Sequence, residues 1–229
     1  MALPKLETLT HILVVPSTKK TIEYRPFLVK EEKLLMQAEE SNDEKQYLQS
    51  LKDIVKSCTF GKLTIDTLTS YDLEYIFLQL RCKSIGETVE VMLEDAETKE
   101  KVPVKINLSE VQVKESKEKV EEKINLSDTI SLKLRPIPVK HMDKMTDADL
   151  TRSIRYMIES VYDANDIYDL DDCSDEEVTE FIDSFPHTAL VDIEKFVVNQ
   201  PKVSHTVEFK GPKGHDNKVT IEGFQNFFL

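Results

Sequence analysis

The sequence is short of the residues from which phosphate-binding loops and nucleophile turns are built. Its 229 residues include 5 glycines, no tryptophan and 3 cysteines. So few glycines leave little material for a Gly-rich phosphate loop, and the sequence shows neither a paired-histidine zinc helix nor a nucleophile elbow. We therefore predict no catalytic residue and no cofactor, and we expect that the protein is not an enzyme.

The three cysteines are too few and too scattered for a disulfide framework. Cys58, Cys82 and Cys173 are odd in number and widely spaced, whereas disulfide-rich domains carry an even set. Cys58 continues the apolar series of Leu51 and Ile54 at helical spacing. This pattern predicts a small core residue and not a reactive thiol.

Long hydrophobic runs are missing as well. The longest apolar runs, such as residues 12–16, have five or fewer residues, whereas a transmembrane helix needs about 20. The first residues also lack the basic region and apolar stretch that mark a secretory signal. We expect the protein to be soluble and to be made in a cytoplasm. We do not expect it to bind a membrane.

Positive charge is in deficit. Asp and Glu total 43 against 30 Lys and Arg, a net charge of −13, whereas binding to nucleic acids or anionic membranes requires a cationic surface. The lysines of residues 114–123 are interleaved with glutamates and form no basic face. Nucleic acid is therefore excluded as a partner. The hydrophobic fraction of 40% still suffices for a packed core.

The densest acidic stretch covers residues 163–183. A calcium loop that starts at Asp169 would place Glu180 at its twelfth position, but Ser174 stands where the turn glycine belongs. We interpret the stretch as a solvated acidic loop and helix start, because carboxylates favour a helix N-terminus. No metal ligands are predicted.

Residues 1–87 are expected to form a hairpin followed by helices. Apolar residues alternate before and after a turn signal at residues 16–20. Capping boxes at residues 41–44 and 69–72 precede apolar stripes at helical spacing, and Gly86 is the expected end of the last helix. The predicted elements are a hairpin within residues 7–28 and helices over residues 30–39, 47–58 and 69–86.

Residues 88–140 change to a period of two, which is typical of strands. The segment KINLSE at residues 105–110 recurs as KINLSD at residues 123–128. We interpret the two copies as similar strand–turn units of one antiparallel sheet, since a solenoid requires more repeats. The two prolines of residues 135–138 are expected to end this sheet. Its predicted strands cover residues 88–94, 102–113 and 120–135.

Residues 141–229 return to helical spacing and end in a hairpin. Helices are predicted after caps at residues 146–149 and 174–177, and a third around residues 190–197. The first of these helices is expected to carry Leu150, Ile154, Met157, Ile158 and Val161. A hairpin of residues 204–210 and 218–222 is predicted around a turn at residues 211–214.

The sequence thus predicts an α+β fold with an N-terminal hairpin and helices, a central antiparallel β-sheet, C-terminal helices and a terminal hairpin. The three regions are residues 1–87, 88–140 and 141–229, and they either remain separate or fold as one compact unit.

The order of several motifs resembles one known family. Leu3-Pro4-Lys5-Leu6-Glu7, Pro16-Ser17-Thr18 and the run from Tyr24 to Lys33 are similar to the opening of the baseplate hub proteins of contractile-tailed, T-even-type bacteriophages. That family includes the small hub subunit and the hub assembly catalyst. The likeness is greatest in the block from Tyr71 to Glu87, and it continues through residues 181–184, 193–196 and 223–228.

One position departs from the family pattern. Relatives carry a Cys-x-x-Cys-Gly knuckle before a terminal Phe-Phe, whereas residues 211–215 of this chain have glycines in place of the thiolates. A structural zinc needs about four thiolate or imidazole ligands, which His205 and His215 cannot supply alone. We predict no zinc, and we expect hairpin pairing and burial of the terminal phenylalanines to hold this end.

The resemblance implies a baseplate hub protein that acts through protein–protein contacts, as a hub subunit or as an assembly factor. Its implied partners are other hub or tape-measure proteins, and its implied locations are the host cytoplasm during assembly and the virion tail baseplate. One alternative is a chaperone that is absent from the mature virion. Another is a tail-associated hydrolase, although the 43 acidic residues single out no carboxylate pair.

Six residues are candidate partner contacts. Each arginine among them lies in an apolar motif, where a guanidinium either pairs with a buried carboxylate or meets a hub partner. The apolar segment 223–229 is expected to dock on its own chain or on a partner, because chain ends are normally polar and frayed. The six candidates are Arg25, Phe27, Arg81, Phe224, Phe227 and Phe228.

Overall fold

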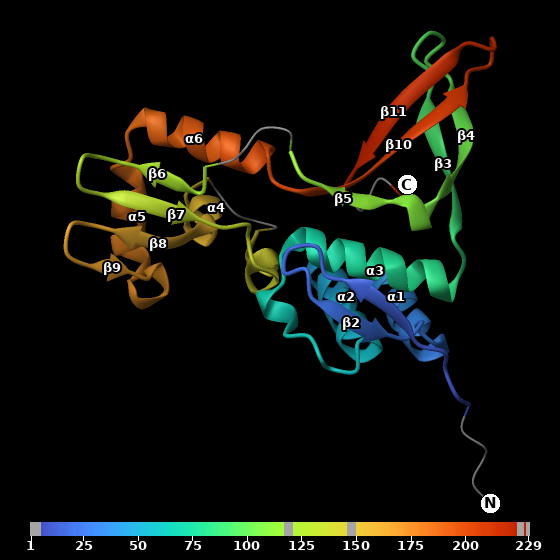
Figure 1. Ribbon diagram of the computed structural model, residues 1–229, viewed down its shortest axis with the longest axis horizontal. Coiled ribbons are helices and arrows are strands. Elements are labelled where there is room, and N and C mark those ends of the chain that lie inside the picture. The colour runs from blue at the N-terminus through green and yellow to red at the C-terminus, as the bar shows by residue number, and fades with distance from the viewer. Residues whose placement is uncertain (1–5, 117–120, 146–149, 224–226, 228–229) are drawn as a thin grey trace, which may run out of the picture. The chain divides into compact units, whose positions relative to one another are not determined.

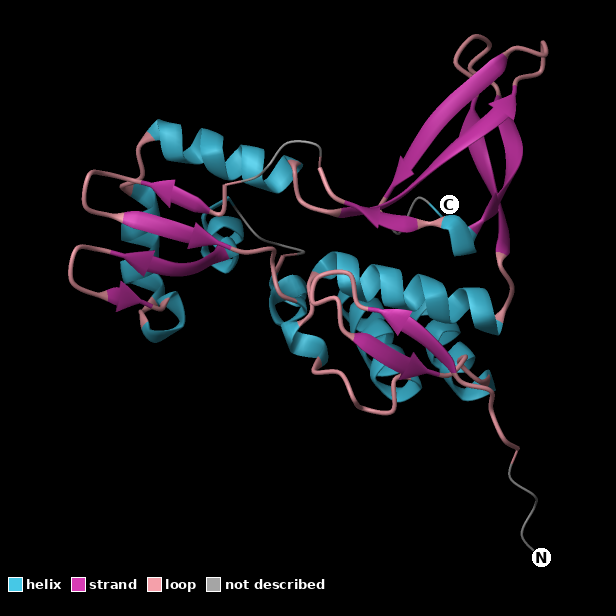
Figure 2. Cartoon of the chain, in the orientation of Figure 1, coloured by secondary structure: helices cyan, strands magenta, loops and turns pink. Residues whose placement is uncertain are grey.

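A computed structural model describes residues 6–116, 121–145, 150–223 and 227 of the chain (Figures 1 and 2). Within these residues the fold is α+β, as predicted, with helices and four small antiparallel sheets. The chain divides into two compact units. We name Met1–Lys114 together with Lys202–Leu229 the split unit, and Glu115–Pro201 the inserted unit.

The split unit begins with a hairpin and three helices. The strands β1 and β2 are antiparallel, with His11 opposite Tyr24. This hairpin and the three helices after it are the ones that the sequence predicts. Their bounds are β1 (His11–Val14), β2 (Thr21–Tyr24), α1 (Val29–Ser41), α2 (Glu44–Cys58), the 3₁₀ turn Ile65–Thr67 and α3 (Ser70–Ser84).

The boundary between α1 and α2 differs from the predicted capping box of residues 41–44. Asp43, and not Ser41, caps α2 by accepting backbone N–H groups of its first turn. Ser41 instead ends α1, and its hydroxyl donates to the carbonyl of Ala38 over 2.7 Å. Asn42, in the left-handed region at φ 51°, stands between them. The capping box predicted at residues 41–44 is therefore wrong. Asn42 ends α1 in the left-handed conformation, and α2 begins only after its own N-cap, Asp43.

Two sheets complete the split unit. The predicted terminal hairpin is confirmed, with Ser204 opposite Glu222. Leu78 and Cys82 of α3 share one apolar core with these sheets and with Phe227. β3 (Thr88–Glu94) pairs with β4 (Lys101–Asn107), which the 3₁₀ turn Leu108–Glu110 follows, and the other sheet has the order β11 (Asp216–Glu222), β10 (Lys202–Lys210), β5 (Gln112–Lys114).

The described part of the inserted unit combines one antiparallel sheet, in the order β6-β7-β8-β9, with three α-helices. Apolar residues of the sheet and of all three helices form a core of their own, which includes Leu132, Ile154 and Phe196. The elements are β6 (Lys123–Asn125), β7 (Ser131–Leu134), the 3₁₀ turn Val139–Lys144, α4 (Leu150–Met157), β8 (Ile158–Tyr162), β9 (Ile167–Tyr168), the 3₁₀ turn Leu170–Asp172, α5 (Asp175–Asp183) and α6 (His187–Val198).

The single central sheet predicted from the sequence is wrong. The first copy of the repeated segment ends β4 and the second forms β6, and these strands belong to different sheets in different units. The prolines of residues 135–138 follow the end of β7, but β8 and β9 extend that sheet. A period of two identifies strands, but it does not say which strands pair.

The helix predicted to carry Ile158 and Val161 ends earlier than expected. Both residues lie in β8, where Val161 is opposite Leu132 of β7. The register of β8 shifts between Lys133 and Leu134 of β7, so that Ile158 is opposite Leu134 and both apolar residues of β8 are buried. The long-range pairing with β7 overrides the local helical pattern. The cap predicted at residues 146–149 lies outside the described residues.

The chain leaves the split unit and returns to it at one strand pair. β5 ends at Lys114, β10 begins at Lys202, and these two residues are partners in the register. The division therefore differs from the three consecutive regions, 1–87, 88–140 and 141–229. The middle region is shared between both units, and the terminal hairpin pairs with β5.

Candidate functional site

The first predicted arginine lies in a buried ionic cluster. Arg25, which follows β2, is 8% exposed, and its Nη2 donates to Glu31 Oε1 in the first turn of α1 over 2.8 Å. The same nitrogen donates over 3.0 Å to Ser57 Oγ in α2, and Ser57 donates to Glu31 over 2.9 Å. Of the two alternatives for Arg25, the structure thus shows the buried carboxylate pair, which connects the hairpin with α1 and α2.

This cluster is ionised, and the thiol beside it is inert. Burial opposes ionisation of Glu31, but hydrogen bonds from Arg25, the Leu28 N–H and Ser57 outweigh it and lower the pKa of Glu31 to about 2. Burial raises the pKa of the Cys58 thiol to about 11. Because Cys58 is fully buried and stays protonated at neutral pH, the structural role predicted for it is confirmed.

A second buried carboxylate fastens the hairpin turn to α3. Asp72 accepts the Ser17 N–H over 2.9 Å, the Ser17 hydroxyl over 2.5 Å and the Thr69 N–H over 3.1 Å. Thr69 caps α3 and forms the predicted capping box with Asp72. Two of the family-like motifs, the turn at residues 16–18 and the block from Tyr71, therefore meet through a structural contact.

Two more of the predicted contact residues lie on or near α3. Phe27 is buried and stacks on Phe77 of α3, with ring centroids 6.3 Å apart. Arg81 of α3 is half-buried, and this burial lowers the pKa of its guanidinium. Because Arg25 is also buried, the structure does not gather these residues into one exposed patch.

The apolar C-terminal segment docks, in part, on its own chain. Phe227 has no exposed surface and packs in the core of the split unit. Phe224 and Phe228, the other two predicted contacts, lie outside the described residues. Of the expected ways to hold this end, hairpin pairing and burial of Phe227 are confirmed.

A polar cluster that the sequence does not predict also holds the tip of this hairpin. Asp95, after β3, has no exposed surface, and its Oδ1 lies 2.5 Å from His215 Nε2 and accepts Asn217 Nδ2 over 2.6 Å. Thr98 donates to its Oδ2 through both the backbone N–H and the hydroxyl. Burial opposes ionisation, but the bonds from Thr98, Asn217 and His215 hold the pKa of Asp95 well below its usual range.

Gly211 lets the two hairpins approach at this cluster. A Cβ at this position would lie 2.6 Å from Cε1 of His215 and would overlap the Asp95 carboxylate. A side chain at position 211 would therefore displace the side chains of Asp95 and His215. The cluster of Asp95, His215 and Asn217, named here the tip cluster, joins the β3–β4 and β10–β11 hairpins by hydrogen bonds.

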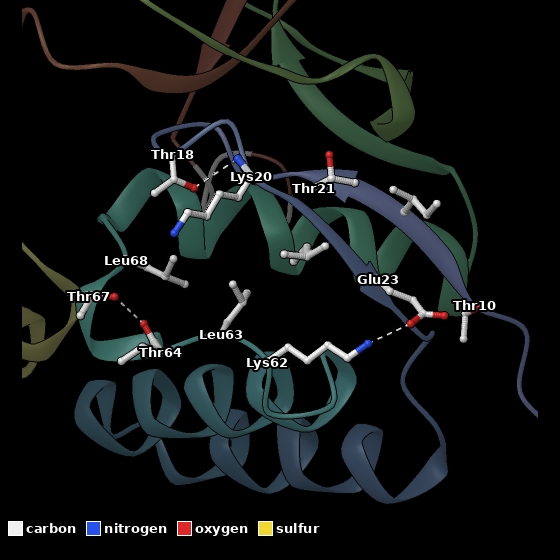
Figure 3. Close-up of a pocket in the computed structure, with 12 residues that line it drawn as sticks. Thr10, Thr18, Lys20, Thr21, Glu23, Lys62, Leu63, Thr64, Thr67 and Leu68 are labelled. Atoms are coloured by element: carbon white, nitrogen blue, oxygen red, sulfur yellow. Dashed lines mark hydrogen bonds and ion pairs between the residues drawn. The ribbon is translucent and has the colours of Figure 1, made fainter.

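The split unit has a groove between the β1–β2 hairpin and the segment Lys62–Leu68 (Figure 3). Its volume is about 770 Å³. Lys62 spans one end of this hairpin groove and pairs with Glu23 of β2 over 3.0 Å. The other lining side chains are mainly threonines and aliphatic residues: Thr10, Ile12, Thr18, Lys20, Thr21, Ile22, Leu63, Thr64, Thr67 and Leu68.

Exposed apolar side chains continue from the groove along β1. Ile12 is 73% exposed and Val14 47%, whereas Leu13 and Val15 between and after them are buried. Among the described strands β1 pairs only with β2, so its other edge presents unpaired backbone groups. An exposed strand edge with outward apolar side chains is a surface on which an extended segment of another protein can add a strand.

Within the described residues, no three His, Cys, Asp or Glu side chains converge as metal ligands do. None of the described helices has the length and apolar character needed to cross a bilayer. The hairpin groove offers hydroxyls, aliphatic side chains and a backbone edge, which suit the binding of a peptide.

Comparison with known proteins agrees with the motifs. A family described as T4 bacteriophage base plate protein matches residues 8–229. Neither the curated proteins nor the solved structures yield a match. The family match includes the hairpin, the helices of the split unit, the whole inserted unit and the terminal hairpin. On this match across nearly its full length, the chain belongs to the T4 bacteriophage base plate protein family.

Proposed function

We propose that this baseplate protein acts in the tail baseplate hub, as a hub subunit or as a hub assembly factor, through protein–protein contacts and without catalysis. The observation that supports it best is the family match over residues 8–229. The buried charges of Arg25 and Asp72 have their partners inside the chain, whereas Ile12 and Val14 of β1 are exposed apolar side chains of the same unit. Other hub or tape-measure proteins are the proposed partners.

The proposed contact surface is β1 with the adjoining hairpin groove. An extended segment of a neighbouring baseplate protein would pair with the free edge of β1 and cover Ile12 and Val14. The net charge of −13 keeps such a protein soluble before assembly and opposes binding to nucleic acid.

Two exposed apolar pairs in the split unit provide a matched test. The double variant Ile12→Glu with Val14→Glu should abolish co-purification with baseplate partners from infected cells and leave the circular dichroism spectrum unchanged. The control is Ile85→Glu with Met92→Glu, at positions outside the β1–β2 hairpin that are 57% and 50% exposed. Equal loss of partners in both double variants would contradict the β1 assignment.

A hub subunit and an assembly factor differ in whether the protein remains in the mature virion. Mass spectrometry of purified virions beside tail-assembly intermediates should detect the protein in at least one of them. A fixed stoichiometry in virions supports a subunit, while presence only in intermediates supports an assembly factor or a tape-measure chaperone. Absence from both would contradict a function in the tail.

A further inference from the structure

The inserted unit holds an apolar pocket that the proposed function does not use. It measures about 310 Å³ and lies between the end of the sheet and α5. Its lining includes three almost fully buried residues: Val161 of β8, Leu170 of the 3₁₀ turn before α5, and Val178 of α5. Ile130, Tyr168 of the edge strand β9 and Phe181 of α5 also line it. A concave apolar site of this kind accepts a side chain of comparable chemistry.

Two carboxylates also line this pocket, Asp163 and Glu177. Asp163 accepts the N–H groups of Asn165 and Asp166, and these bonds lower its pKa. Glu177 is held in the capping box of α5 by Ser174, which lowers its pKa as well. Both carboxylates are therefore ionised at neutral pH and are held in place before any ligand arrives.

The surrounding segment is acidic throughout. Residues 163–183 contain ten Asp and Glu and no Lys, Arg or His. Some of these carboxylates have cationic partners outside the segment, among them Asp171 with Lys140 over 3.1 Å, and Asp175 with Arg155. Because the segment itself supplies ten carboxylates and no cation, a negative potential surrounds the pocket.

We propose that this acidic pocket binds a cationic segment of another protein, with one apolar side chain in the pocket and Lys or Arg side chains against Asp163, Glu177 and their acidic neighbours. Charge complementarity favours this occupant, because the inserted unit has 21 acidic and 10 basic residues. The split unit, with 22 acidic and 20 basic residues, carries no opposite net charge with which a second copy would match it. The proposal rests on the proposed function as a contact protein, and it holds for a subunit and for an assembly factor.

One thiol can report whether the pocket is occupied. Cys173 lines the pocket and is partly exposed, whereas Cys58 and Cys82 are buried. Alkylation of the native full-length chain by iodoacetamide should therefore modify Cys173 first. A side chain that enters the pocket will slow this reaction, which mass spectrometry can follow.

The probe is a synthetic peptide with one central leucine flanked on both sides by lysines. It should protect Cys173 from alkylation at low salt, and the protection should weaken as sodium chloride is added, since salt screens exposed charges. Two comparison peptides separate the two parts of the proposal. Replacement of leucine by serine removes the apolar side chain, replacement of the lysines by glutamates inverts the charge, and neither peptide should protect the thiol.

Paired charge variants locate the binding site. Neutralising three exposed carboxylates of the acidic segment should weaken binding of the lysine peptide roughly tenfold, because each exposed pair contributes modestly. The control neutralises three exposed carboxylates of the split unit and changes the net charge by the same amount, so its affinity should stay within about twofold. The test variant is Asp166→Asn, Glu176→Gln and Glu180→Gln, and the control is Glu40→Gln, Glu90→Gln and Glu100→Gln.

Three outcomes would overturn the proposal. One is equal weakening by the test and control variants, and another is protection of Cys173 by the glutamate peptide. The third is a dimer in solution that the test variant alone dissociates, which would assign the pocket to a second copy. Failure of the proposed function is distinct, because it is measured by loss of baseplate partners in the Ile12 and Val14 variant and does not depend on the peptide.

Discussion

The two units place their charges in opposite ways. The split unit is almost neutral, with 20 basic and 22 acidic residues, yet it buries Arg25, Glu31, Asp72 and Asp95. The inserted unit carries a net charge of −11, from 10 basic and 21 acidic residues. Among its described residues no Lys, Arg, Asp or Glu is buried, and its core is apolar.

This difference separates charges that orient the chain from charges that face outward. A buried charged group needs hydrogen-bond partners in a fixed geometry, so the ion pair of Arg25 with Glu31 and the hydrogen bonds of Ser17 to Asp72 determine how the hairpin lies on the helices. The carboxylates of the inserted unit have few such partners and remain open to solvent and to a cationic ligand. Changes to single charges should therefore affect stability in the split unit and binding in the inserted unit.

The largest effect is expected from Glu31→Ala. This change leaves the Arg25 guanidinium buried without its carboxylate, which should reduce the free energy of unfolding by about 3 kcal/mol. Urea denaturation followed by circular dichroism measures the loss, and hydrogen exchange should locate it in the split unit. The exposed neighbour Glu32 is the control, since Glu32→Ala should change the free energy by less than about 0.5 kcal/mol. Equal losses in the two variants would remove the distinction between buried and exposed charge.

A smaller loss is expected at the tip cluster. In Gly211→Ala the new methyl group would press on His215 and Asp95, and such overpacking should reduce stability by about 2 kcal/mol. Gly214→Ala is the control in the same turn, because its φ of +86° brings strain but nothing lies within 4 Å of its Cβ. It should lose only about 1 kcal/mol. Equal stability of the two variants in thermal unfolding would mean that the contacts of a methyl group with His215 and Asp95 do not destabilise the protein.

The pH dependence should distinguish the two units. Burial lowers the pKa of His141 in the inserted unit from 6.5 to about 4. The unfolded chain thus binds the proton more readily, so the stability from neutral His141 is complete above pH 6.5 and is lost as the pH falls toward 4. For Glu31 in the split unit the loss falls between pH 4.5 and about 2.

Measured by hydrogen exchange, the inserted unit should therefore weaken first on acidification, by about 1 kcal/mol after discounting for solvent screening. His141→Phe should remove the slope between pH 6.5 and 4. The exposed His187 serves as the control, and His187→Gln should leave the slope in place. A slope that is the same in both variants would contradict the assignment to His141.

The smallest effect concerns salt. Because like charges repel in the inserted unit, raising sodium chloride from low to moderate concentration should stabilise it by about 0.5 kcal/mol relative to the split unit. Hydrogen exchange at both salt concentrations measures the difference within one sample. A larger gain in the split unit would mean that its buried pairs are open to screening.

Local signals predicted most elements of this fold, and long-range contacts account for the failures. The capping boxes at Thr69 and Ser174 lie where the sequence indicates them, because each depends on residues three positions apart. The partner of His215 in the tip cluster is Asp95, 120 positions away, and no local pattern connects them. A turn with Asp95 followed by Thr98 after a strand is the one signal that the sequence offers for this carboxylate.

The buried pair of Arg25 was one of two alternatives, and the sequence could not choose between them because Ser57 and Glu31 come from different helices. The exposed β1 edge and the hairpin groove were not predicted. Alternation identifies a strand, but the surface left open depends on what the rest of the chain covers.

The pairing of Lys114 with Lys202 determines when the split unit can complete its sheet during synthesis. Residues 202–222 leave the ribosome after the whole inserted unit, yet they supply β10 and β11 of the unit that began at the first strand. Because domains tend to fold as units during translation, the inserted unit can close while the split unit still waits for two of its strands. A ribosome that stops before residue 202 would thus release one finished acidic module attached to an open sheet edge at β5.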